Sequence, residues 1–66
     1  MNDTIRILIV DDHFMVRMGL VSSLNDESDM QVVGEAGTAQ QALEIFRQVQ
    51  PDVTLMDLCL PDGLKA

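Results

Sequence analysis

The stretch IRILIVDD (residues 5–12) decides the fold of this chain, and VTLMD (residues 53–57) repeats its pattern. Each contains a short, continuous apolar run rich in β-branched residues, which is typical of a strand buried in a parallel sheet. Each run is followed at once by aspartate. In an open α/β sheet, ligands bind at the carboxyl ends of the strands. If the two strands are neighbours, the carboxylates of Asp11, Asp12 and Asp57 converge at one edge of the sheet.

A first helix is predicted for about residues 14–24. Either Asp12 or His13 precedes it, and Asp12 is the better N-cap by residue type. The helix carries two apolar stripes, although an amphipathic surface helix needs only one. Two explanations of the second stripe have equal weight. The helix is packed between the sheet and a neighbouring helix, or the stripe is a protein–protein surface. The stripes are Val16, Leu20 and Leu24, and Phe14, Met18 and Val21.

The remaining segments complete an alternating pattern. Residues 30–36 follow a polar loop and read as a second strand. Thr38 and Gln41 have the spacing of a capping box, which opens a second helix running to about residue 48. Residues 52–56 form the third strand. Right-handed crossovers between parallel strands make this β-α-β-α-β chain an α/β doubly wound parallel sheet of strand order 2-1-3.

Composition narrows the classes of function. The chain has 66 residues, so it is one domain or part of one. Its net charge of −7 disfavours direct contact with nucleic acid and suits cations and basic partners. The single cysteine, Cys59, excludes an intrachain disulfide. A signal-peptide pattern is absent and no apolar run approaches about 20 residues, so we expect no membrane contact and a cytoplasmic location.

The acids predict a cation site with phosphoryl chemistry. Carboxylates that converge repel one another unless a cation or a proton joins them. Mg²⁺ is the simplest candidate, because it takes oxygen ligands and keeps several waters. A carboxylate can also act as a nucleophile and form an acyl phosphate. The plainer alternative is structural: Asp11 and Asp12 would form only a turn and a helix cap, and Asp57 another turn.

Four segments carry a resemblance to a known family: ILIVDDH (7–13), VRMGL (16–20), VVGEA (32–36) and PDVTLMDLCLP (51–61). They are similar to NarL/FixJ-type response-regulator receiver domains of two-component systems, which implies a flavodoxin-like, CheY-like fold. By this resemblance Asp57 is the phosphoacceptor and Asp12 a direct Mg²⁺ ligand. Asp11 acts nearby, often through water, and the backbone carbonyl of Cys59 is the third protein ligand. The resemblance also implies a sensor histidine kinase as partner and, in the full-length protein, a C-terminal helix-turn-helix domain that binds DNA.

The resemblance extends over the N-terminal half of a receiver. Family receivers have five strands and five helices, within the usual domain size of about 100–150 residues. Residues 1–66 therefore read as a truncated receiver, with its C-terminal part and any DNA-binding domain absent. The family's hydroxyl residue and lysine from the later strands are missing, and Lys65 lies too early to replace that lysine. We expect a phosphoacceptor and not an enzyme, with self-phosphorylation and dephosphorylation impaired.

Rival hypotheses come from other functional classes. A non-signalling interaction or dimerisation module could retain the acids; tight association without Mg²⁺ binding or Asp57 modification would favour it. A metal-dependent phosphatase with an aspartyl nucleophile commonly has an acid two residues further on, where this chain has Cys59. His13 reads as a turn residue more than as a ligand or base. The third strand is an open edge without Lys or Pro, so we also expect a homodimer.

Overall fold

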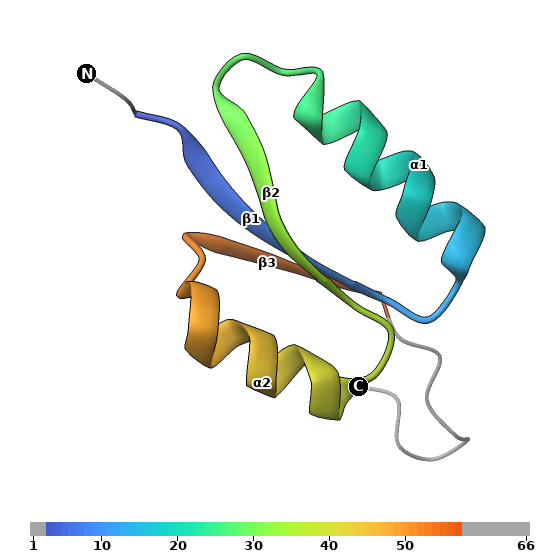
Figure 1. Cartoon of the computed structure of the whole chain (residues 1–66). Coiled ribbons are helices and arrows are strands. Elements are labelled where there is room, and N and C mark those ends of the chain that lie inside the picture. Colours follow the sequence, from blue (N-terminus) through green and yellow to red (C-terminus); the bar gives the residue numbers. More distant parts are fainter. Residues whose placement is uncertain (1–2, 58–66) are drawn as a thin grey trace.

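A computed structural model describes residues 3–57 of the chain. Its elements are β1 (Ile5–Asp11), α1 (Phe14–Asn25), β2 (Met30–Ala36), α2 (Ala39–Val49) and β3 (Val53–Asp57). The three strands form one parallel sheet of order β2-β1-β3, which confirms the predicted α/β topology. Figure 1 shows α1 and α2 on opposite sides of this sheet.

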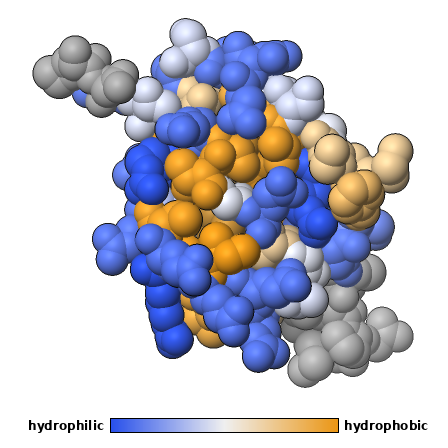
Figure 2. All heavy atoms as spheres, viewed as in Figure 1, coloured by the Kyte–Doolittle hydropathy of each residue, from blue (hydrophilic) through white to orange (hydrophobic). Residues whose placement is uncertain are grey.

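The core is built around β1, because this strand is paired on both sides and covered by both helices. Its side chains from Ile7 to Val10 are at most 4% exposed. Successive side chains point to opposite faces of a strand. Leu8 and Val10 pack with Ala36 and Ala42 in one buried cluster, which Ile45 of α2 contacts. Figure 2 shows that apolar surface remains visible between the hydrophilic residues on the face it displays.

The register between β1 and β2 contains one irregularity. Ile7 is the partner of Val32 and Leu8 that of Gly34, so the register skips Val33. A Cβ atom at Gly34 would lie 2.6 Å from Cγ2 of Ile45 and 3.3 Å from Cδ1 of Leu8. The absence of a side chain at Gly34 therefore lets α2 approach the sheet closely.

α1 begins at Phe14, as predicted, but its cap is not the residue that the sequence favoured. The N-cap is His13, whose carbonyl accepts the first helical hydrogen bond from Arg17 N at 2.9 Å. Its side chain makes no capping hydrogen bond. The preceding turn is closed by Asp11, whose Oδ1 accepts from the N–H of His13 at 2.8 Å. This Asx turn accompanies the extended conformation of His13, and the preference for Asp12 over His13 as the cap is wrong.

The sheet-facing side of α1 combines residues from both predicted stripes. Leu20 and Leu24 of the first stripe are half-buried, as is Val21 of the second. Val16 is exposed, contrary to its place in the first stripe, and so are Phe14 and Met18. The side toward the sheet runs between the two stripes, and none of its residues is fully buried. Its half-buried positions are Arg17, Leu20, Val21 and Leu24.

One of the two hydrogen bonds of the predicted capping box is present at the start of α2. Thr38 Oγ1 accepts from the N–H of Gln41 at 3.1 Å. The return bond differs, because Gln41 Oε1 accepts from the N–H of Gly37 at 3.0 Å and not from that of Thr38. Neither α1 nor α2 is long and apolar enough to cross a membrane.

A clamp around Arg6 joins the start of β1 to the end of α2. Gln50 ends α2 with a φ of 47°, a left-handed conformation that is uncommon outside glycine. Arg6 Nη1 donates to the Gln50 carbonyl at 2.9 Å. The Arg6 N–H donates to Asp52 Oδ2 at 2.9 Å, and the Asp52 N–H donates to the Arg6 carbonyl at 2.8 Å. These bonds set the position from which β3 begins.

Candidate functional site

The two acid-terminated strands end side by side. β1 and β3 are parallel neighbours, and their register pairs Asp11 with Asp57. Partners in a parallel register lie on the same face of the sheet, so both acids belong to the face covered by α1. Asp11 is fully buried and Asp57 is exposed. Cys59, the predicted carbonyl ligand, lies outside the described residues.

The turn from Asp11 to His13 brings three side chains together. His13 Nδ1 lies 3.3 Å from Asp11 Oδ1 and 3.0 Å from Asp12 Oδ1. Ionised carboxylates only accept hydrogen bonds, so both contacts require the proton on Nδ1. One possible ligand atom from each of the three residues lies within 4.8 Å of the others. The turn therefore gathers two carboxylates and one imidazole at the carboxyl end of β1.

Asp11 has one oxygen whose surroundings suit a cation. Oδ2 is buried and accepts no hydrogen bond from any residue between 3 and 57. Buried polar atoms are nearly always bonded, and a buried carboxylate oxygen without a partner is costly. A hard divalent cation would satisfy it, because such ions take oxygen ligands. The donor set therefore fits Mg²⁺, while the ligand roles assigned to Asp11, Asp12 and Asp57 stay predictions.

Asp57 does not belong to the compact group formed by Asp11, Asp12 and His13. Its backbone is adjacent to Asp11 through the register, yet its side chain is exposed at the end of an edge strand. The sequence pattern thus correctly placed Asp11 and Asp57 at the same edge of the sheet. The pattern could not separate a buried acid from an accessible one.

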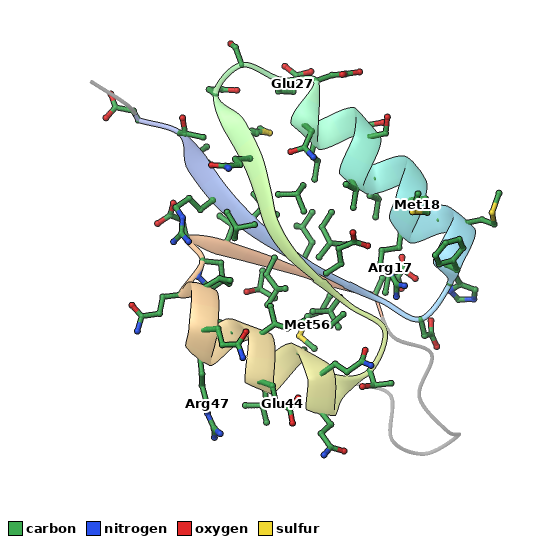
Figure 3. All side chains as sticks on the ribbon, viewed as in Figure 1. Arg17, Met18, Glu27, Glu44, Arg47 and Met56 are labelled. Atoms are coloured by element: carbon green, nitrogen blue, oxygen red, sulfur yellow. The ribbon has the colours of Figure 1, made fainter. Side chains whose placement is uncertain are left out.

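Sequence reasoning missed Arg17 and described His13 only in part. His13 is a turn residue as predicted, and the run Asp-Asp-His was the signal that its ring would also lie near both carboxylates. Arg17 interrupts the otherwise apolar inner side of α1, which was the signal for a buried partner. Its Nη1 donates to the backbone carbonyl of Asp11 at 2.8 Å, and its Nε donates to Glu35 Oε1 at 3.2 Å. Figure 3 shows Arg17 reaching from α1 toward the carboxyl ends of the strands.

Comparison with known proteins agrees with this arrangement. Residues 7–65 match the family model of the response regulator receiver domain. The response regulator protein VraR of Staphylococcus aureus is 46% identical over 59 residues, covering 89% of this chain and 28% of the relative. The chain thus spans 28% of the length of this curated relative.

Solved structures show the same fold. The response regulator domain of Thermotoga maritima CheB matches with a TM-score of 0.82 and 39% identity, over 89% of this chain and 44% of that one. A two-component response regulator of the LuxR family from Aurantimonas sp. SI85-9A1 matches with a TM-score of 0.79 and 41% identity, over 89% of this chain and 42% of that one. The family match, the sheet order and the paired acids together place this chain in the response regulator receiver domain family.

Proposed function

We propose that this chain is a phosphoacceptor domain that receives a phosphoryl group on Asp57 in a two-component phosphorelay. The observation that carries the proposal is the register between β1 and β3, which sets exposed Asp57 beside buried Asp11. An acceptor must be reached by a donor protein, and Asp57 is accessible. The neighbouring acids must attract a cation, and they lie in the adjacent turn.

The proposed transfer balances without a further reactant. A carboxylate oxygen of Asp57 attacks the phosphorus of a phosphohistidine on a sensor histidine kinase, and an acyl phosphate forms. The phosphorus–nitrogen bond breaks, and the histidine nitrogen keeps the electron pair. The protein must make the acid accessible and reduce charge repulsion, because phosphoryl transfer depends mostly on positioning and electrostatics.

Mg²⁺ is the proposed cofactor, with the carboxylates of Asp11, Asp12 and Asp57 and the carbonyl of Cys59 as its ligands. When bound, it supplies positive charge that offsets the charge of the phosphoryl oxygens and of the acids. Support comes from Asp11 Oδ2, which is buried and has no hydrogen-bond partner in the part of the chain that the structure describes.

The wider setting is part of the same proposal. In the full-length protein this domain would control a DNA-binding domain and hence transcription, in the cytoplasm. The segment itself, with a net charge of −7, would make no direct contact with DNA. The comparisons give no support to the alternative of a non-signalling module.

We further propose that copies of the chain form a homodimer. Within residues 3–57, β3 pairs with β1 alone, and its other edge is free to pair with a second strand. No Lys or Pro interrupts Val53–Asp57 to oppose such pairing. An exposed apolar surface on α1, with Phe14 and Met18, offers a second route.

Labelling with acetyl phosphate tests the acceptor. The wild-type chain should gain one phosphoryl group, slowly and only with Mg²⁺, as followed by intact mass. Asp57→Asn should abolish the gain, and Asp29→Asn, which removes another exposed acid, should not. Labelling that survives Asp57→Asn, or its absence from the wild-type chain with both acetyl phosphate and a phosphorylated kinase, would refute the proposal.

A further inference from the structure

We propose that Arg17 is a positioning residue for the acidic turn: it holds the peptide that joins Asp11 to Asp12 in the orientation that binds the cation. This inference rests on the proposed function, because it concerns the same acids. It assigns a role to a residue outside the acid set, on the helix that follows the turn.

The geometry places Arg17 between three elements. It belongs to α1, its Nη1 binds the Asp11 carbonyl at the end of β1, and its Nε binds Glu35 near the end of β2. The Arg17 side chain is 18% exposed and that of Glu35 is 41% exposed, so water screens the bond to the Asp11 carbonyl less than it screens the ion pair with Glu35. The Phe14 ring lies against the guanidinium, with Cζ 5.6 Å from the ring centroid. A planar guanidinium can hold two acceptors in fixed directions, which an ammonium group cannot.

The orientation of the carbonyl group that Arg17 binds is linked to the backbone conformation of the turn. It belongs to the peptide unit between Asp11 and Asp12, so its direction sets ψ of Asp11 and φ of Asp12 together. The Asp11 side chain adds a second constraint on the same turn, because its Oδ1 accepts from the N–H of His13. Without Arg17, ψ of Asp11 could change on its own, and such a rotation about the Cα–C bond of Asp11 would carry the Cα–Cβ bond of Asp12 to a new direction. Arg17 thus controls where the second carboxylate points.

Gly37 provides the space that Arg17 occupies. A Cβ atom at Gly37 would lie 2.8 Å from Arg17 Nη1, the atom that binds the Asp11 carbonyl. An alanine there would push the guanidinium without touching any acid and without changing its charge. Gly19 offers a matched control, because a Cβ atom there would meet nothing within 4 Å.

The experiment is a Mg²⁺ titration of the 66-residue chain followed by amide NMR, on wild type, Arg17→Lys, Gly37→Ala and Gly19→Ala. Arg17→Lys and Gly37→Ala each retain the positive charge. We expect both to weaken Mg²⁺ binding by about tenfold, as for other residues that orient metal ligands. They should also shift the Asp12 and His13 amides before metal is added. Gly19→Ala should leave both quantities at their wild-type values.

A merely structural Arg17 gives a different result. The urea midpoint, read by circular dichroism, would fall in Arg17→Lys and Gly37→Ala while the Mg²⁺ dissociation constant and the Asp12 and His13 amides of the folded chain stay unchanged. That outcome overturns the inference. If the wild-type chain itself binds no Mg²⁺, the proposed function fails. The metal-free amide shifts then still decide the role of Arg17, and unchanged shifts overturn it.

Discussion

β1 and β3 have nearly the same kind of sequence and very different surroundings. Both are apolar runs that end in aspartate. In β1, Leu8 and Ile9 are completely buried, whereas Leu55 in β3 is 41% exposed. The cause is position: β1 has a strand on each side and a helix on each face, and β3 is an edge of the sheet. An apolar run therefore predicts a strand, and the order of the strands decides how deeply it is buried.

The same contrast separates the two acids. Asp11 ends the central strand and is buried, while Asp57 ends the edge strand and is exposed. Burial suits an acid that holds a cation, because a low dielectric strengthens that attraction. Exposure suits an acid that a donor protein must reach, as proposed for Asp57. One repeated sequence pattern thus supplies two chemical environments side by side.

The largest expected effect on stability is the difference between Leu8→Ala in β1 and Leu55→Ala in β3. Leu8→Ala should lower the free energy of unfolding by about 2–5 kcal/mol, because it leaves a cavity in the closed core. Stability of about 3–5 kcal/mol is usual for so small a core, so much of this variant should be unfolded. Leu55→Ala should cost about 1 kcal/mol, since Leu55 already contacts water. Urea unfolding followed by circular dichroism measures both, and equal losses would show that β3 is buried like β1.

Gly34→Ala tests how tightly the centre of the sheet is packed. The new methyl group would press on Ile45 and Leu8, and we expect a loss of about 1–3 kcal/mol in the free energy of unfolding. Gly19→Ala adds the same methyl group in open space on α1 and should not destabilise the chain. The urea midpoints of the two variants give the comparison. A Gly34→Ala midpoint equal to that of Gly19→Ala would mean that α2 packs more loosely than described.

Asp11→Asn and Asp57→Asn compare the two acids directly. In EDTA, Asp11→Asn should raise the free energy of unfolding by about 1 kcal/mol, because a buried carboxylate with an unbonded oxygen is replaced by a neutral amide. Asp57→Asn should change it by less than about 0.5 kcal/mol, as is usual at exposed sites. Thermal and urea unfolding with and without Mg²⁺ provide the measurement, and Mg²⁺ should no longer stabilise Asp11→Asn. Destabilisation of the metal-free chain by Asp11→Asn would contradict this assignment.

The smallest expected effect concerns the open edge of β3. Leu55→Lys should weaken self-association about threefold to fivefold, roughly 1 kcal/mol or less, because a charge on an edge strand opposes pairing. Sedimentation equilibrium across a wide concentration range gives the dissociation constant. Met18→Lys on α1 is the comparison, and a larger effect there would move the interface to the first helix. A wild-type chain that stays a monomer at high micromolar concentration would exclude the homodimer.

The sequence was sufficient for the features that depend on local pattern. The bounds of β2 are those predicted, β3 lies one residue further along the chain than predicted, and the strand order follows from the alternation of elements and the handedness of crossovers. The shared edge of Asp11 and Asp57 followed from that order. Local pattern was enough there because strand period and crossover hand are properties of short segments.

Features that depend on tertiary contact could not be predicted. The inner side of α1 runs between the two apolar stripes, so residue spacing assigned Val16 to the wrong side. His13 became the N-cap because Asp11 closes an Asx turn, which residue preference for Asp12 did not reveal. Arg17 meets Glu35 and the Asp11 carbonyl only after β2 has paired with β1.

The clamp around Arg6 has a consequence for the order of folding. Its bonds to Gln50 and Asp52 join residues 44 and 46 positions apart, more than half the chain. Closing so long a loop is entropically unfavourable and yields few contacts until it is complete, which makes such pairings slow. The β1-α1-β2 unit, by contrast, closes over shorter separations. We therefore expect β3 to dock after β1, α1 and β2 have packed, so that one edge of β1 stays unpaired until residue 52 has been synthesised.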